Sequence, residues 1–235
     1  MSKTTRKKKS EANAKLWIAV SAGVLLLAVI IIIFAATGTK DSKEDTGKQN
    51  DKSDQGEQSG QGDQLEQGKQ SEPLYADIVI KDYGTITIVL DAEAAPETVD
   101  NFISLAESGF YDGLTFHRII EGFMMQGGDP NGDGTGGSGT TITGEFSANG
   151  HDNNLSHTRG TVSMARAKAY NSASSQFFIV HEDSTYLDGE YAAFGHVTSG
   201  MEIVDQICAD AVPIDGNGLI AAYAQPVIES VTIHE

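Results

Sequence analysis

The chain has 235 residues, and its 16 Lys and Arg against 33 Asp and Glu give a formal net charge of −17 at pH 7. The charge is uneven, because residues 74–235 carry only five basic side chains against 23 acidic ones. So acidic a segment argues against nucleic-acid binding, which depends on Lys and Arg to neutralise phosphates, and it should be repelled from anionic lipid. The alternative is that the charge only keeps this segment soluble.

An apolar run over residues 16–37 predicts a transmembrane anchor. Its first 21 residues contain no charged side chain, and at about 1.5 Å each they match a hydrocarbon core of roughly 30 Å. Residues 1–15 form a basic N-terminus, which the positive-inside rule places in the cytoplasm, so the rest of the chain is expected outside it. A cleaved signal peptide, which would release the protein, is the alternative, although the run exceeds the usual apolar length of about 7–15 residues.

Residues 38–73 predict a disordered polar linker. Gly, Gln, Ser, Lys, Asp and Glu dominate this segment, so it cannot bury enough apolar surface to offset the entropy of ordering. Residues 74–235 then form a single domain, which is long enough to build a core by packing alone. The only cysteine, Cys208, cannot form an internal disulfide and fits a buried helix position.

Hydrophobic periodicity predicts the first elements of this domain. Residues 76–90 alternate apolar and polar side chains around a turn, which is typical of a β-hairpin. Ala95-Pro96 opens a helix with Pro in its first turn, and Gly109 ends it. A second helix is predicted over residues 201–209.

Between these helices, short apolar runs are separated by Gly-rich turns. Residues 176–180 and 192–197 are two such runs. Many short strands of this kind favour a mainly β domain, a closed antiparallel barrel.

Residues 116–129, with the sequence FHRIIEGFMMQGGD, carry the strongest functional signal. Their single arginine, Arg118, lies among four large apolar side chains and one amide: Phe116, Phe123, Met124, Met125 and Gln126. A cationic donor in an apolar surface suits a site that grips a neutral, partly hydrophobic ligand and polarises one of its bonds. An ion pair of purely structural role is the alternative for Arg118 in so acidic a domain.

Several motifs follow in order: GTGG at 134–137, VSMARA at 162–167, SQFFI at 175–179, YLDG at 186–189 and FGHV at 194–197. Together with residues 116–129 they resemble the cyclophilin-type peptidyl-prolyl cis-trans isomerases, from about Ala76 to the C-terminus. The resemblance implies a closed eight-stranded antiparallel barrel capped by two α-helices. It also implies a monomeric isomerase of Xaa-Pro bonds in polypeptides that needs no metal or cofactor.

The resemblance further implies a role for each residue at a matching position. Arg118 is implied as the catalytic residue, which donates a hydrogen bond to the prolyl nitrogen. The implied proline pocket has four members: Phe123, Met124, Phe178 and Leu187. The implied contacts to the remainder of the substrate are Gln126, Gly134, Ala165, Arg166, Ala167, Gln176, Tyr186 and Tyr191.

Three positions depart from the residues usual in that family. Arg166 stands where Asn is usual, and a positive side chain at the rim could alter the choice of peptide. Tyr186 stands where Trp is frequent, which resembles cyclophilins with weakened cyclosporin binding. Tyr191 replaces a frequent His and keeps a hydrogen-bonding ring.

Other features near these motifs have structural interpretations. His117 suggests a general base, but amide rotation needs none, so we expect a structural, hydrogen-bonding histidine. Residues 129–134 match the first half of an EF-hand calcium loop, but the twelfth position is Thr140 rather than Glu, so a Gly/Asp-rich turn is preferred. Phe177 and Phe178 point to opposite faces of a predicted strand, and only Phe178 is expected in the site.

Two classes of function remain open from the sequence. The first is an isomerase anchored in the cell membrane, with its domain on the extracytoplasmic face, that assists the folding of exported or surface proteins in a bacterium. The second is a non-catalytic module or chaperone that binds Pro-containing segments. The combination of Arg118 with the predicted pocket favours the first.

Overall fold

The computed structural model describes residues 72–235. The predicted basic N-terminus, transmembrane anchor and all but the last two residues of the predicted linker lie outside the described residues. In the described part, no helix combines the length and the hydrophobicity needed to cross a bilayer.

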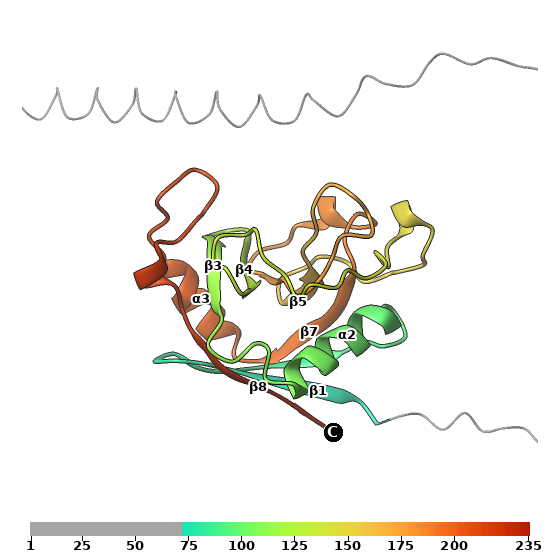
Figure 1. The fold of residues 1–235 in the computed structure, drawn as a ribbon, viewed down its shortest axis with the longest axis horizontal. Coiled ribbons are helices and arrows are strands. Elements are labelled where there is room, and N and C mark those ends of the chain that lie inside the picture. Colours follow the sequence, from blue (N-terminus) through green and yellow to red (C-terminus); the bar gives the residue numbers. More distant parts are fainter. Residues whose placement is uncertain (1–71) are drawn as a thin grey trace, which may run out of the picture. The chain divides into compact units, whose positions relative to one another are not determined.

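Eight strands and two α-helices occur within residues 72–235 (Figure 1). In chain order they are β1 (Leu74–Ile80), β2 (Gly84–Leu90), α2 (Pro96–Glu107), β3 (Thr115–Ile120), β4 (Met124–Asp129), β5 (Thr161–Met164), β6 (Phe177–Val180), β7 (Ala193–Ser199), α3 (Met201–Asp210) and β8 (Ile228–His234). Short 3-10 helices lie in the connections: η1 (Ser147–Asn149), η2 (Thr185–Leu187) and η3 (Ala222–Ala224). The mainly β class and the number of strands and helices are therefore as predicted.

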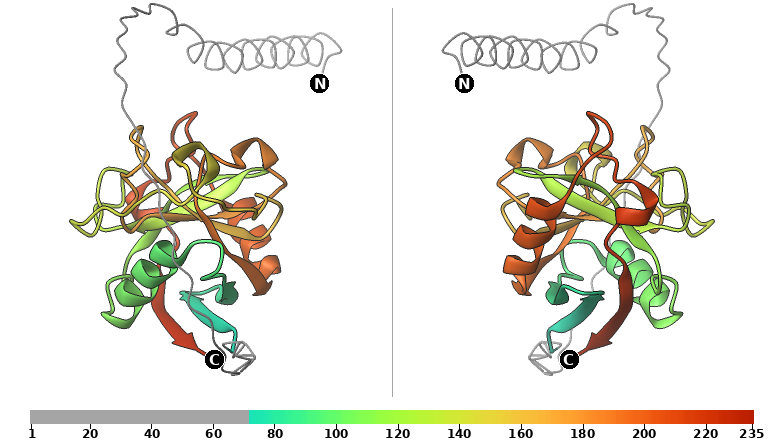
Figure 2. Two further views of the ribbon diagram at one scale, coloured as in Figure 1. Left: turned by 90° about the vertical axis from the view of Figure 1, so that its right-hand side faces the viewer. Right: turned by 90° about the vertical axis from the view of Figure 1, so that its left-hand side faces the viewer.

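The strands form one antiparallel sheet in the order β3-β4-β6-β5-β7-β2-β1-β8. The sheet curls into a half-barrel, and α2 and α3 lie on opposite sides of it (Figures 1 and 2). The predicted closed barrel is wrong, because the edge strands β3 and β8 share no ladder. They meet through an isolated bridge between Thr115 and Val227. Pro226, directly before that bridge, has no N–H to donate, and β3 shifts register on both sides of Phe116, so a regular ladder cannot continue.

The predicted hairpin is confirmed as β1 and β2, which pair from Leu74 opposite Leu90 to Ile80 opposite Gly84. Burial alternates along both strands, and the inward side chains join the core. The turn places Asp82 at φ 66° and Gly84 at φ 128°. Only glycine adopts the latter freely, which explains the Gly at this position.

Both predicted helices are confirmed, and α2 owes its start to a distant residue. Pro96 occupies the first turn, but Ala95 at the N-cap makes no side-chain hydrogen bond. Instead the buried carboxylate of Glu145 accepts from the N–H groups of Glu97 (3.0 Å) and Thr98 (2.8 Å) and from the Thr98 hydroxyl (2.7 Å). These bonds satisfy donors that a helix leaves unpaired at its N-terminus. In α3, Cys208 is buried as expected, and burial raises the pKa of its thiol to about 12.

Two apolar clusters fill the interior. The larger one packs α2 against the sheet around aromatic side chains, which include Phe102, Tyr111 and Phe177. The smaller one consists of Met124, Phe178 and Val180 on the other face of β4 and β6. Neighbouring residues of one strand thus enter different clusters, as period-two alternation requires. The smaller cluster lies where the functional motifs converge.

Candidate active site

Strand pairing brings the central side chains of the site together. In the ladder, Arg118 of β3 lies opposite Gln126 of β4, and Gln126 lies opposite Phe178 of β6. Directly paired residues share a face of the sheet, with Cβ atoms roughly 4.5–5.5 Å apart. A cation, an amide and an aromatic ring therefore stand in one row across three strands.

This row lines a cavity of about 160 Å³ that has one apolar wall, formed by Phe123, Met124, Phe178 and Leu187. It is lined by nine of the residues predicted from the sequence: Arg118, Phe123, Met124, Gln126, Ala165, Arg166, Phe178, Leu187 and Tyr191. Tyr186 stands outside this lining, 70% exposed, with its ring 6.0 Å from that of Phe123. The predicted proline-pocket residues are thus gathered around one hollow of the surface.

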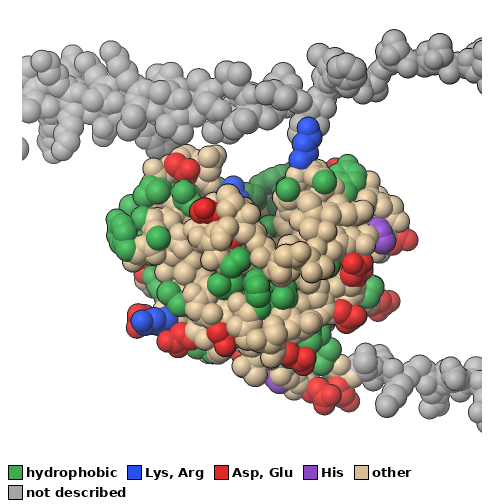
Figure 3. Space-filling view, in the orientation of Figure 1, with side chains coloured by type: hydrophobic (Ala, Val, Ile, Leu, Met, Phe, Trp, Pro, Cys, Tyr) green, Lys and Arg blue, Asp and Glu red, His purple; other side chains and the backbone are tan. Residues whose placement is uncertain are grey.

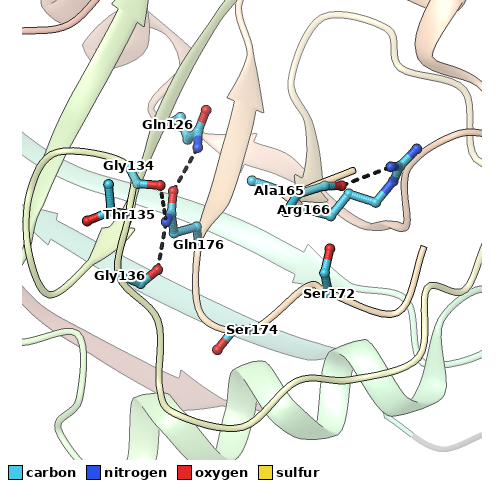
Figure 4. A pocket seen from close by; sticks show the side chains of 10 residues that line it. Gln126, Gly134, Thr135, Gly136, Ala165, Arg166, Ser172, Ser174 and Gln176 are labelled. Carbon is cyan, nitrogen blue, oxygen red and sulfur yellow. Dashed lines mark hydrogen bonds between the residues drawn. The ribbon is translucent and has the colours of Figure 1, made fainter. Parts of the chain in front are cut away.

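A second cavity, which is polar and has a volume of about 220 Å³, adjoins the first at Gln126 (Figure 4). Gln176 is its central residue: its side chain accepts from the Gln126 amide (2.8 Å) and donates to the carbonyls of Gly136 (2.8 Å) and Gly134 (3.2 Å). Ala165 and Arg166 line both cavities, so the two belong to one groove.

Four residues of the polar cavity were missed from the sequence: Thr135, Gly136, Ser172 and Ser174. These residues were only weakly indicated by the sequence: each lies inside one of the sequence motifs or within three residues of one. Their small polar side chains carry no periodicity that would mark them as a site. Gly134 and Ala167, which were predicted, also belong to this end of the groove.

Arg118 is held by neutral acceptors rather than by a carboxylate. Its Nε donates to the carbonyl of Asn217 (2.7 Å), and its Nη1 lies 3.3 Å from the Gln126 amide oxygen. Its guanidinium carbon is 5.9 Å from the centre of the Phe123 ring. Within residues 72–235 the ion pairs do not include Arg118, so the structural ion-pair alternative is not supported there. Burial lowers the pKa of Arg118, yet an arginine stays protonated at neutral pH.

The guanidinium of Arg166 packs against three aromatic rings. Its guanidinium carbon lies 4.8 Å from the ring centre of Tyr191 and 5.1 Å from those of Phe146 and Tyr170. Nε also donates to the carbonyl of Glu190 (3.0 Å). The guanidinium is thereby engaged within the protein, which favours a role in holding the wall at Tyr191 over direct selection of charged peptides.

A buried histidine behind Phe178 was not predicted. His157 is fully buried, with Nδ1 2.9 Å from the Asp188 carboxylate and Nε2 3.0 Å from the Ser163 hydroxyl. Its ring stacks on Phe178, with centres 6.0 Å apart and planes 18° apart. Burial lowers the pKa of His157, although the hydrogen bond and charge of Asp188 act in the opposite direction. A neutral imidazole therefore supports the ring of Phe178 from behind.

This arrangement makes stability depend on pH. Between the lowered pKa of folded His157 and its ordinary value of 6.5, the unfolded chain takes up a proton that the folded chain does not, so stability falls as pH falls. We expect urea unfolding to show a lower free energy of unfolding at about pH 5 than at about pH 7.5, by about 1.4 kcal/mol for each pKa unit of lowering. His157→Gln should reduce this difference, whereas His196→Gln, at an exposed position, should keep it. An equal pH effect in wild type and His157→Gln would contradict the assignment.

The structure contradicts the expectation for His117 and agrees with the expected turn at Asp129. His117 is buried, but neither ring nitrogen has a hydrogen-bond partner within residues 72–235, so the expected hydrogen bonds are absent from that part of the chain. The Asp129 loop is a tight turn, since its carboxylate accepts from the N–H groups of Asn131 (2.8 Å) and Gly134 (2.6 Å). Burial would raise the pKa of Asp129, but these backbone donors hold it below its ordinary value.

A family model and known proteins match most of the described residues. The model of the family "Cyclophilin type peptidyl-prolyl cis-trans isomerase/CLD" matches residues 75–234. Peptidyl-prolyl cis-trans isomerase B of Bacillus subtilis is 52% identical over 124 residues, which cover 53% of this chain and 83% of that protein. A peptidyl-prolyl cis-trans isomerase of Synechococcus elongatus is 49% identical over 118 residues, covering 50% of this chain and 77% of that protein.

A solved structure gives the same result for the fold. The crystal structure of a Cryptosporidium parvum cyclophilin type peptidyl-prolyl cis-trans isomerase in the presence of the dipeptide Ala-Pro has a TM-score of 0.60 and 31% identity, and the match covers 68% of this chain and 99% of that chain. The family match over residues 75–234, the named relatives and the shared fold lead to one conclusion. The chain belongs to the cyclophilin-type peptidyl-prolyl cis-trans isomerases and is an enzyme of that class.

Proposed function

We propose that this isomerase assists the folding of exported or surface proteins, with Arg118 as the catalytic residue and the cavity at Phe178 as the proline pocket. The observation that carries the catalytic part is the row of Arg118, Gln126 and Phe178 beside a cavity of about 160 Å³. A prolyl ring fits the apolar part of this hollow. The peptide chain would then continue over Gln126 toward the polar cavity.

The chemistry of the bond explains why an arginine suffices. Resonance gives the amide C–N bond a rotation barrier of about 18–20 kcal/mol, so uncatalysed isomerisation takes roughly 10–100 s at 25 °C. In the twisted transition state the prolyl nitrogen becomes pyramidal and regains a lone pair. A guanidinium N–H directed at that nitrogen stabilises the twisted state more than the planar one, which is differential binding. A stabilisation of about 5 kcal/mol corresponds to a rate increase of about 10³–10⁴.

The apolar wall has a separate task in this mechanism. Phe178 is buried against Met124 and Val180 and is backed by His157, so it offers a firm surface to the prolyl ring. If the ring is held, rotation moves the carbonyl that precedes the proline. Proline-containing polypeptides are therefore the proposed substrates. The crystal structure of the Cryptosporidium relative, determined in the presence of Ala-Pro, supports this choice.

Tyr186, at the rim of the cavity, is expected to affect inhibitor binding. Tyr186, which replaces the frequent Trp, is 70% exposed beside Phe123. We expect weakened binding of cyclosporin for this reason. We also expect the domain to act as a monomer.

The proposed place of action rests on the sequence before the domain. Residues 16–37 suit a transmembrane anchor, residues 1–15 a cytoplasmic basic segment, and residues 38–73 a polar linker. Polypeptides leave a translocation channel unfolded, so an isomerase tethered on that side of the membrane would meet its substrates there. Acidic side chains dominate the charged surface shown in Figure 3, which suits a domain kept away from anionic lipid.

Protease accessibility tests this location. The full chain is expressed in a bacterial host, and protease is added to intact spheroplasts. We expect loss of the isomerase domain from the full chain and its protection in a variant that lacks residues 1–37, because only the former is exported. N-terminal sequencing of the mature protein separates a retained anchor from a cleaved signal peptide. A protected domain in the full chain would contradict the proposed location.

A further inference from the structure

The loop that follows α3, residues 211–219, lies against the strand that carries Arg118 (Figure 1). Leu219 forms an isolated antiparallel bridge with Arg118, and the Ile119 N–H donates to the Gly218 carbonyl (2.9 Å). Gly218 has φ +87°, and a Cβ at this position would collide with Ile120. The 211–219 loop therefore approaches β3 as closely as a backbone can, which only glycine allows here.

This close approach brings a backbone acceptor to the arginine. The carbonyl of Asn217 accepts from Arg118 Nε at 2.7 Å, a shorter contact than that between Nη1 and the Gln126 amide (3.3 Å). Because a guanidinium is planar and its donors are fixed relative to one another, the direction of the Nε–H bond sets where both Nη groups lie. The Asn217 carbonyl thus aligns the part of Arg118 that faces the cavity.

One carboxylate oxygen sets the position of that carbonyl. Asp215 Oδ1 accepts from the N–H of Asn217 (2.9 Å) and from the N–H of Leu219 (3.0 Å). These two donors lie on either side of the Asn217 carbonyl along the chain. The hydrogen bonds from backbone N–H groups, of which that of Leu219 has the largest effect, lower the pKa of Asp215. The negative charge of Asp215 in turn favours the protonated form of Arg118. The carboxylate itself is exposed, so its contacts serve the loop rather than the core.

We propose that Asp215 is a positioning residue for Arg118, which acts by fixing the turn that presents the Asn217 carbonyl to Nε. The inference rests on the proposed catalytic role of Arg118. It assigns a part in the reaction to a loop that contributes none of the cavity lining around Arg118 and Phe178. Since the geometry of a reacting group strongly affects rate, loss of this turn should lower kcat more than it changes KM.

The test compares Asp215→Ala with Asp215→Asn. Both N–H groups bond to the same oxygen, so the Asn carbonyl can accept both, whereas Ala can accept neither. We expect kcat on an Xaa-Pro peptide to fall about tenfold in Asp215→Ala with KM within about twofold of wild type, and to recover in Asp215→Asn. The ¹⁵N resonance of Arg118 Nε should shift in Asp215→Ala only. Asp152→Ala removes an equal charge from another exposed position and should match wild type in both readouts.

The outcomes separate the two proposals. If Arg118→Ala loses activity while Asp215→Ala keeps wild-type kcat and an unshifted Nε resonance, the inference about Asp215 fails and the role of Arg118 stands. If Arg118→Ala keeps full activity, both fail. An Asp215→Asn variant as slow as Asp215→Ala would also overturn the inference, since the charge rather than the turn would then matter. The amide spectrum of each variant reports whether the domain has folded.

Discussion

Alanine at Phe177 is expected to lower the free energy of unfolding by about 3–5 kcal/mol, which is the usual cost of removing a buried aromatic side chain. Phe177 is fully buried in the larger cluster. Its ring meets those of Phe102 and Tyr111 edge-on, with centres 5.5 Å apart in both cases. Since none of these contacts faces the groove, the folded fraction of the variant should keep the KM of wild type.

The same substitution at the next residue, Phe178, should change substrate binding more than stability. Phe178 lines the cavity and contacts the ring of Tyr191 edge-on at 5.9 Å. We expect Phe178→Ala to raise KM about tenfold, because the lost contact with a prolyl ring corresponds to about 1.4 kcal/mol. The loss of stability should be smaller than at Phe177, since the space left by the ring opens to solvent.

Denaturant unfolding and steady-state kinetics on one Xaa-Pro peptide distinguish the two positions. Phe177→Leu and Phe178→Leu provide milder variants if either alanine variant does not fold. The assignment of these neighbours to core and site would be wrong if Phe177 variants raised KM while Phe178 variants changed only stability.

The parts of the fold that followed from the sequence are those with local periodicity. Residues 76–90 alternate with period two, and α2 and α3 carry apolar side chains at helical spacing, so β1, β2 and both helices were correctly predicted. Closure of the barrel was not, because it depends on the backbone at Phe116 and Pro226, which lie far apart in the chain. A local sequence pattern does not show whether two edge strands that lie far apart in the chain will pair.

The site divides in the same way. The motifs order the candidate residues along the chain, and strand pairing then brings Arg118, Gln126 and Phe178 together. The supporting contacts were missed. His157 and Asp215 act through loops, where single polar residues have many equally plausible partners. Only the three-dimensional structure reveals which partner each one meets. The anchor and all but the last two residues of the linker lie outside the described residues, so both stay predictions.

Arg118→Ala is expected to have the largest effect on catalysis. Removal of a preorganised donor that acts on developing charge or a developing lone pair costs about 2.7–4 kcal/mol in comparable sites, or about 10²–10³ in kcat. KM should change little, because the prolyl ring is held by Phe178 and its neighbours rather than by the guanidinium. Arg118→Lys keeps the charge but loses the planar fork and the Nε contact with Asn217, so it should recover only part of the rate.

Arg159→Ala is the matched control for this substitution. Arg159 pairs with Asp205 at 2.7 Å and is 41% exposed, so its removal changes the net charge by the same amount. We expect its kcat to stay within about twofold of wild type, because Arg159 lines neither cavity of the groove and a surface substitution usually disturbs the fold little. A comparable loss of rate at Arg159 would indicate that overall charge, rather than the position of Arg118, governs catalysis.

The central claim is that Arg118 stabilises the twisted state of the Xaa-Pro bond more than the planar one. Exchange spectroscopy on an Xaa-Pro peptide at saturating enzyme measures this directly, since it gives the isomerisation rate of the bound peptide apart from its affinity. For Arg118→Ala we expect a bound-state rate at least about 100-fold below that of wild type, with a dissociation constant within about threefold. Equal bound-state rates in wild type and Arg118→Ala would contradict the account.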